Sequence, residues 1–302
     1  MFKYNSANNY FKKRFGKKVY KIAVDCGFTC PNRDGTKGVG GCIFCSEGGS
    51  GEFAIKGTDI SLQLKQAKEK VKNKINGDKG YICYFQSFTN TYAPVEKLRE
   101  IYYSVLSDKE IVAISIATRP DCLSDDVLAL LEELNQKIPV FIELGLQTSN
   151  EKTAQIINRC YDNQCFIEAV EKLKKINIEV IAHIIIGLPD ETVKDYVNSV
   201  KFASFCGVKG IKLQLLHVLK NTRLALMEYT PLSMEDYFYA LKECLINIPP
   251  EIVIHRLTGD GDKKILIAPL WSGDKHNVLN KLNEYMNKNN VIQGSAINGQ
   301  NT

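Results

Sequence analysis

The sequence contains no apolar run long enough to cross a membrane. None of its 302 residues belongs to a stretch of 18 consecutive apolar residues, and the opening segment MFKYNSANNYFKKRFGKK lacks the uninterrupted apolar run of a signal peptide. Internal repeats and Pro-rich linkers are also missing. We therefore expect a cytoplasmic protein with no membrane partner and one main domain.

The composition excludes several classes of protein. Hydrophobic residues make up 44% of the chain and charged residues 24%, close to the averages of globular proteins, so neither a disordered nor a fibrous class is indicated. The net charge of +5 has a local origin, because residues 1–21 contain six lysines and one arginine but no acidic residue. This basic segment predicts either a solvated, amphipathic N-terminal helix or a surface that attracts phosphates.

Short apolar, β-branched runs alternate with segments of helical spacing. The apolar runs lie at 22–26, 81–85, 111–117, 139–146, 178–186 and 210–216. The helical segments lie at 60–75, 95–106, 124–136, 165–176 and 193–206. This order predicts a parallel α/β sheet covered by helices, either a complete or partial barrel or a doubly wound sheet, with its chemistry at the carboxyl ends of the strands.

The pattern also suggests a division of the chain. We predict a basic N-terminal segment over 1–21, a core over 22–255 and a C-terminal extension over 256–302.

Four of the ten cysteines crowd into a glycine-rich segment after the first predicted strand. Without a secretion signal, cysteines are expected to be reduced thiols, some of them metal ligands. Cys26, Cys30, Cys42 and Cys45 suit either zinc or an iron–sulfur cluster, and their spacing alone fits a four-thiolate zinc site equally well. Cys26 ends an apolar run, a position typical of a buried core thiol, which leaves Cys30, Cys42 and Cys45 as metal ligands.

The segment GFTCPNRDGTKGVGGCIFC resembles the cluster loop of the YhcC/YtqA-type radical S-adenosylmethionine (SAM) family, which is related to the elongator catalytic subunit. The spacing Cys30-x11-Cys42-x2-Cys45 matches the long first gap of that family. The segments ELGLQT, INR, IIGLP, LLHVLKNTRL and HRLTGD match it further along the chain. One departure is that Arg159 is followed by Cys160 and Tyr161 where Gly and His are expected.

The resemblance implies a fold, two cofactors and a reaction. The fold is a partial (βα)6 TIM-like barrel with an N-terminal helix and a C-terminal extension. The cofactors are a 4Fe-4S cluster held by Cys30, Cys42 and Cys45, and SAM bound to the open iron. The implied enzyme receives electrons from a donor such as flavodoxin or ferredoxin. It cleaves SAM reductively to a 5′-deoxyadenosyl radical that abstracts hydrogen from its substrate.

The resemblance and the residues together indicate contacts to SAM, but no catalytic residue. The predicted contacts are Gln86, Ser87, Glu143, Gln147, Arg159 and Gly187. Glu143 and Gln147 lie four apart in an extended segment and so face the same side, where a buried carboxylate needs a ligand or a basic partner. Arg159 would bind the SAM carboxylate through its fork, and Gly187 would let the backbone approach adenine. His183, inside an apolar strand, is expected to be a core residue.

The relatives of this family act on wobble uridines of tRNA. The resemblance therefore implies tRNA as the partner, with conversion of a 5-carboxymethylaminomethyl side chain to the 5-aminomethyl form. The basic residues Lys12, Lys13, Arg14, Lys17 and Lys18 and the lysines at 65, 68, 70, 72 and 74 would meet phosphates. Two alternatives remain open: a radical SAM enzyme acting on a small metabolite or peptide, and a zinc-bearing nucleic-acid binding module without catalysis.

Overall fold

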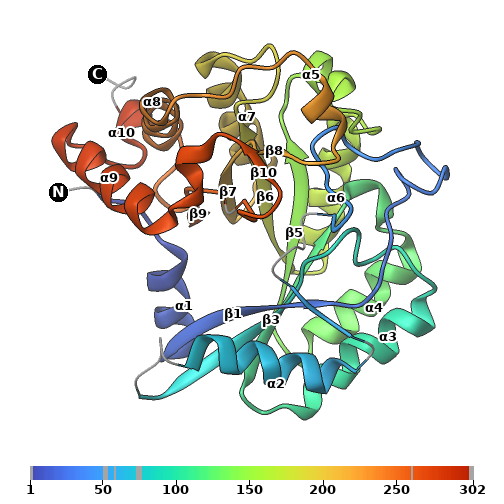
Figure 1. Ribbon diagram of the computed structural model, residues 1–302. Helices are drawn as coiled ribbons and strands as arrows, with labels where there is room; N and C mark the ends of the chain where they lie inside the picture. Colours follow the sequence, from blue (N-terminus) through green and yellow to red (C-terminus); the bar gives the residue numbers. More distant parts are fainter. Residues whose placement is uncertain (1–2, 50–53, 58, 73–76, 260, 299–302) are drawn as a thin grey trace.

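The computed structural model describes residues 3–49, 54–57, 59–72, 77–259 and 261–298. Its centre is a parallel sheet with the strand order β2-β1-β3-β4-β5-β6-β7-β9, which curls into an open half-barrel (Figure 1). The strands are β1 (Lys18–Asp25), β2 (Ile55–Lys56), β3 (Lys79–Phe85), β4 (Ile111–Thr118), β5 (Val140–Gln147), β6 (Glu179–Ile186), β7 (Gly210–Leu215) and β9 (Val253–Arg256). A separate antiparallel pair joins β8 (Val218–Leu219) and β10 (Leu266–Ala268).

Amphipathic helices cover the convex face of this sheet (Figure 1). They are α2 (Ile60–Val71), α3 (Val95–Ser104), α4 (Asp125–Asn135), α6 (Asn163–Lys175), α7 (Val193–Cys206) and α8 (Met234–Ile246). Side-chain caps fix several of their starts; the carboxylate of Asp162, for example, accepts the backbone N–H of Cys165 at 2.8 Å. Further helical elements are α1 (Ala7–Phe15), α5 (Glu151–Ile156), α9 (Lys275–Lys288), α10 (Ser295–Asn298), η2 (Val105–Ser107), η3 (Pro120–Cys122), η4 (Arg223–Leu226) and η5 (Leu270–Gly273). Among the described helices, none has the length and apolar character needed to cross a membrane.

The predicted α/β partial barrel with an N-terminal helix is confirmed, but its parallel sheet also contains β2 and β9 beyond the six predicted strands. The six predicted strands correspond to β1 and β3 to β7, and the five predicted helices to α2, α3, α4, α6 and α7, although residues 73–75 of the first lie outside the described residues. The sequence did not predict β9, which extends the sheet beyond β7. Its four residues include His255 and Arg256, so they form no apolar run.

The interior of the half-barrel is closed at the amino ends of the strands. There α1 packs against β1 and β9, and the Phe11 ring meets Phe141 and His255 edge-on with centroids 5.6 Å apart in both pairs. An apolar floor consists of Phe11, Val19, Ile82, Ala113, Phe141 and Ile181. The opposite end, where the strands have their carboxyl ends, remains open and is called the mouth below.

The basic N-terminal segment therefore lies at the opposite end from the mouth. Arg14 pairs with Glu179 at the start of β6, and Lys17 lies 3.8 Å from Asp78, just before β3. On α2, Lys68 pairs with Asp108 and Glu110, while Lys74 lies outside the described residues. The predicted helix is present as α1. It closes the amino end of the barrel, so the structure does not bring its charges to the mouth.

Candidate active site

A cavity of about 330 Å³ opens at the mouth of the half-barrel. Its walls are built from every second residue of the strands, because alternate side chains of a strand point to the same face. These residues include Tyr84, Gln86, Ala117, Glu143, Gly145, Gln147, His183, Ile185, Lys212 and Gln214. The loop after β1 covers one side of the cavity and contributes the cysteines.

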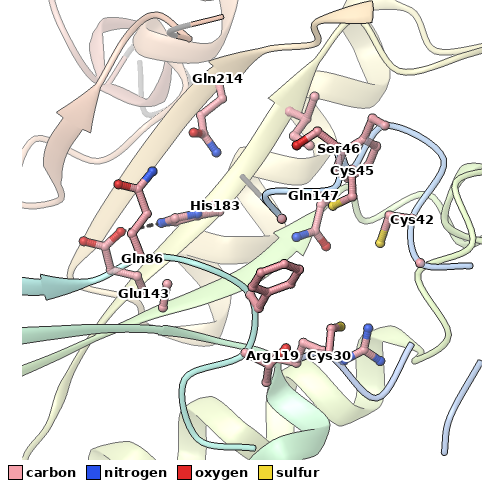
Figure 2. Close-up of a pocket in the computed structure, with 18 of the residues that line it drawn as sticks. Cys30, Cys42, Cys45, Ser46, Gln86, Arg119, Glu143, Gln147, His183 and Gln214 are labelled. Atoms are coloured by element: carbon pink, nitrogen blue, oxygen red, sulfur yellow. Dashed lines mark hydrogen bonds and ion pairs between the residues drawn. The ribbon is translucent and has the colours of Figure 1, made fainter. Parts of the chain in front are cut away.

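Cys30, Cys42 and Cys45 all line this cavity, as the sequence led us to expect. A tight turn, in which the Cys45 N–H donates to the Cys42 carbonyl at 3.1 Å, presents two of the thiols from one loop. Figure 2 shows the three sulfurs around one part of the cavity, with Cys30 approaching from the side of Arg119. The Cys45 thiol donates a hydrogen bond to Cys42, and the positive charge of Arg119 also favours the Cys42 thiolate. Together they outweigh burial and lower the pKa of Cys42 to about 7.

The donor set fits an iron–sulfur cluster in its chemistry. Thiolates are the ligands of 4Fe-4S clusters, and three of them leave one iron open for another ligand. The amide of Asn32 lies 3.6 Å from the Cys42 sulfur and can donate to it, a contact of the kind that tunes such clusters. Within the described ranges, no three histidine, cysteine or acidic side chains surround one point closely enough to hold a single metal ion.

Cys26 lies apart from this group. It packs against the main hydrophobic core and does not line the cavity. Burial, together with the neighbouring Asp25 carboxylate, raises the pKa of the Cys26 thiol to about 12, so it stays protonated at neutral pH. The exclusion of Cys26 from the metal ligands stays a prediction.

The deepest part of the cavity contains a buried ion-pair network centred on Glu143. One carboxylate oxygen accepts from Lys21 and from the Ser115 hydroxyl, the latter at 2.7 Å. The other oxygen accepts from Lys212 and lies 2.7 Å from Nε2 of His183. A carboxylate has about four acceptor positions, so these four partners occupy Glu143 fully.

This network shifts the pKa values of its members. Burial acts to raise the pKa of Glu143, but Lys21 and Lys212 hold it well below its usual range. Burial lowers the pKa of Lys212, and repulsion from the charges of Lys21 and Arg256 lowers it further. Attraction by Glu143 opposes them only in part, and the resulting pKa is about 7. Burial and Lys212 lower the pKa of His183 to about 4, so His183 is neutral at physiological pH.

The structure brings some of the predicted SAM contacts to the cavity but not all of them. Gln86, Glu143 and Gln147 line it, whereas Ser87 and Gly187 do not. The buried hydroxyl of Ser87 has no hydrogen-bond partner among the described residues. The carbonyl of Gly187, whose φ is +95°, accepts from the Tyr229 hydroxyl at 2.6 Å.

Arg159 lies outside the cavity wall and is almost completely buried. All five of its N–H donors bind protein acceptors. These acceptors are the carbonyls of Leu146, Thr148 and Tyr161 and the side chains of Glu151 and Asn163. Its guanidinium also lies over the Tyr161 ring, whose hydroxyl is 2.8 Å from Oε1 of Gln147. Arg159 thereby braces the end of β5 from which Gln147 projects.

Sequence reasoning missed several residues of the site. Lys21, Tyr84 and Lys212 form the network around Glu143, and Arg119 and Arg256 line the cavity. Their signal was present in the sequence, because Lys21, Glu143, His183 and Lys212 each interrupt an otherwise apolar strand. An interruption on one strand is weak evidence, but a polar residue inside four strands of one sheet, three of them the neighbours β5, β6 and β7, indicates a polar layer in the barrel.

Comparison with known proteins identifies the family. The model of the radical SAM superfamily matches residues 29–203, and that of the Radical_SAM C-terminal domain matches residues 208–288. The chain belongs to the radical SAM superfamily. The radical SAM model covers the cysteine loop and β3 to β6, so it includes the three cysteines and most of the cavity wall.

Relatives and a solved structure extend this likeness. YtqA of Bacillus subtilis is 46% identical over 97% of this chain and 92% of its own length, and YhcC of Escherichia coli K12 is 37% identical over 94% and 92%. A tRNA-2-methylthio-N(6)-dimethylallyladenosine synthase of Fusobacterium nucleatum is 21% identical over 58% of this chain and 41% of its own length. The fold is similar to that of Methanocaldococcus infernus Elp3, with a TM-score of 0.67 and 17% identity over 91% of this chain and 64% of Elp3.

The resemblance predicted from the cysteine loop is therefore confirmed. The protein is a radical SAM enzyme, and the alternative of a zinc-bearing binding module without catalysis is wrong. Membership of this family implies SAM and a 4Fe-4S cluster as cofactors.

Proposed function

We propose that this radical SAM enzyme modifies tRNA at the wobble uridine, converting a 5-carboxymethylaminomethyl side chain to the 5-aminomethyl form. The radical SAM relative whose name denotes tRNA modification supports RNA as the substrate. The observation that carries the proposal is a set of exposed lysines near the mouth: Lys37, Lys220, Lys263 and Lys264. Lys37 lies on the loop after β1, and Lys263 and Lys264 lie between β9 and β10. Lys220 follows β8 and is adjacent in sequence to the cavity residue Leu219.

The chain's own residues would bind and orient the reactants. When bound, the cluster and SAM would supply reductive cleavage of SAM and a radical that abstracts hydrogen. The carboxymethyl group would leave as glyoxylate, with its aldehyde oxygen supplied by water and the one remaining electron and proton released. Cys30, Cys42 and Cys45 would hold the cluster. Gln86 and Gln147 would contact SAM from the cavity wall, and Arg159 would act on SAM by holding Gln147 in place.

The mouth lysines would bind the tRNA backbone. Phosphate contacts provide most of the affinity of such complexes and fix the orientation of the nucleic acid. A splayed anticodon base would then enter the cavity, since RNA bases are recognised mainly in unpaired loops.

The decisive experiment compares modified nucleosides in tRNA from cells with and without the gene for this protein. We expect 5-carboxymethylaminomethyluridine to accumulate and 5-aminomethyluridine to disappear in the deletion strain, and the wild-type gene to restore both. The Cys42→Ala gene serves as the matched control and should not restore them. Identical nucleoside profiles, in a strain without a second enzyme for this step, would reject tRNA and favour a small metabolite or peptide as the substrate.

A further inference from the structure

Asn32 is a buried amide on the cysteine loop, between Cys30 and Cys42. Its side-chain nitrogen lies 2.6 Å from the Asn158 carbonyl oxygen and 3.6 Å from the Cys42 sulfur. The contact with the carbonyl identifies this atom as the nitrogen, because an amide oxygen in its place would face another acceptor. The amide nitrogen has two N–H donors, so it can serve both acceptors, with one N–H directed at Cys42.

The oxygen end of this amide does not explain its burial. Oδ1 of Asn32 is buried and accepts no hydrogen bond from any described residue. Buried acceptors are normally paired because an unpaired one costs free energy, so an exception requires an explanation. The contacts of Asn32 lie at the nitrogen end, where the amide joins the Cys42 sulfur to the segment that follows α5.

A ring of three hydrogen bonds holds the amide in this orientation. Asn32 donates to the Asn158 carbonyl, and the Asn158 side chain donates to the Gly41 carbonyl at 2.7 Å. The Gly41 N–H closes the ring by donating to the Asn32 carbonyl at 2.7 Å, directly before Cys42 in the sequence. Gly38 leaves room for the amide, because a Cβ atom there would lie 2.2 Å from Oδ1 of Asn32. The surrounding backbone thus fixes the direction in which the amide points.

We propose that Asn32 is a positioning residue that acts through Cys42, and that its N–H···S hydrogen bond raises the reduction potential of the 4Fe-4S cluster. The N–H presents its positive end to a thiolate ligand, which stabilises the reduced and more negatively charged cluster over the oxidised one. Asn32 is not a ligand, so the cluster should assemble without it. This inference goes beyond the proposed function, because it concerns the cofactor and holds for any substrate.

Two variants and one control test the proposal. Asn32→Ala removes the amide. Gly38→Ala displaces the amide without removing it, and the backbone at Gly38 lies outside the left-handed region, so the added methyl group acts only through its contacts. Asn135→Ala is the matched control, because its side chain also makes two hydrogen bonds, donating to the Asn177 carbonyl at 3.2 Å and accepting from the Val140 N–H at 3.0 Å. It lies at the end of α4 and makes no printed contact with a cysteine.

The measurement is a redox titration of the reconstituted full-length enzyme, in which electron paramagnetic resonance detects the reduced cluster. Asn32→Ala should lower the ratio of reduced to oxidised cluster about tenfold at a fixed potential, which corresponds to a shift of about 59 mV to more negative values. Gly38→Ala should shift the potential in the same direction, and Asn135→Ala should keep the wild-type potential. The double variant of Asn32 and Gly38 should match Asn32→Ala alone, because Gly38 acts through the amide.

An unchanged reduction potential in Asn32→Ala would overturn the proposal. Additive shifts in the double variant would also count against it, since Gly38 would then act without the Asn32 amide. Iron content, sulfide content and melting temperature are measured on the same samples. If neither folded variant assembles a cluster, Asn32 is required to build the site and its role as a tuning residue is rejected.

Discussion

The ammonium group of Lys212 on β7 donates to the carboxylate of Glu143 on β5, across the intervening strand β6. Lys21 on β1 donates to the same carboxylate, so one buried anion joins distant strands of the half-barrel. Breaking a buried ion pair by removing one partner leaves an uncompensated charge.

Glu143→Gln should therefore destabilise the protein by about 3 to 5 kcal/mol, because it leaves the buried Lys212 and the half-buried Lys21 without their counter-charge. Denaturation of the reconstituted enzyme measures this loss, and the exposed Glu228→Gln is the control. The sequence predicted Glu143 as a direct SAM contact. Weaker SAM binding without a comparable loss of stability would favour that direct contact over the role of an ion-pair centre.

The cluster assignment predicts different outcomes for neighbouring cysteines. Alanine at Cys30, Cys42 or Cys45 should abolish assembly of a cluster with about four irons and four sulfides. Cys26→Ala should leave the iron and sulfide content unchanged, since Cys26 packs against the core. Metal and sulfide analysis after anaerobic reconstitution measures both. A folded Cys26→Ala protein without iron would argue for a fourth thiolate ligand.

Gln147 and Arg159 should respond differently to substitution. Gln147→Asn shortens the side chain but tolerates the positive φ of 61° at this position, so SAM affinity should fall while stability changes little. Arg159→Ala removes five hydrogen bonds and should lower the melting temperature as well as SAM affinity. SAM titrations and thermal denaturation separate the two effects. A stable Arg159→Ala protein with selectively weaker SAM binding would restore the predicted direct contact to the SAM carboxylate.

The position of the lysines predicts which charges bind tRNA. Replacing Lys37, Lys220 and Lys264 by alanine should flatten the logarithmic dependence of tRNA affinity on salt by about two units, since each phosphate contact contributes roughly 0.7 in single-stranded RNA. The matched control replaces Lys12, Lys13 and Lys18, which are exposed at the closed end of the barrel. A smaller salt dependence in the Lys12, Lys13 and Lys18 variant, with no change in the Lys37, Lys220 and Lys264 variant, would support the tRNA contact predicted from the sequence for the N-terminal segment.

Glu191 predicts a pH dependence of stability. Burial and the negative charge of Asp195 raise the pKa of Glu191, while a hydrogen bond from Thr148 lowers it. The net effect is a rise from 4.5 to about 7. The folded state therefore favours protonated Glu191. Its contribution to the free energy of unfolding is fully present below pH 4.5, and about 3 kcal/mol is lost as the pH rises through 7. Glu191→Gln should remove this loss and raise the melting temperature at pH 8 but not at pH 4. If the melting temperatures of the wild type and of Glu191→Gln changed with pH in the same way, this role of Glu191 would be contradicted.

Local sequence patterns predicted the order of most strands and helices and singled out three cysteines that line one cavity in the structure. Hydrophobic periodicity depends on neighbouring residues, so the six strands β1 and β3 to β7 and the helices between them could be located. The spacing of Cys30, Cys42 and Cys45 is equally local, and it led to the family that the comparisons confirm.

The tertiary structure alone decided which charged groups meet. Lys21, Glu143 and Lys212 come together because curling of the sheet brings β1, β5 and β7 around one interior, and strand curvature is not encoded in any one segment. The same reason explains the basic N-terminal segment. Its charge is visible in the sequence, but packing of Phe11 beneath Phe141 directs it to the closed end of the barrel, away from the cysteines.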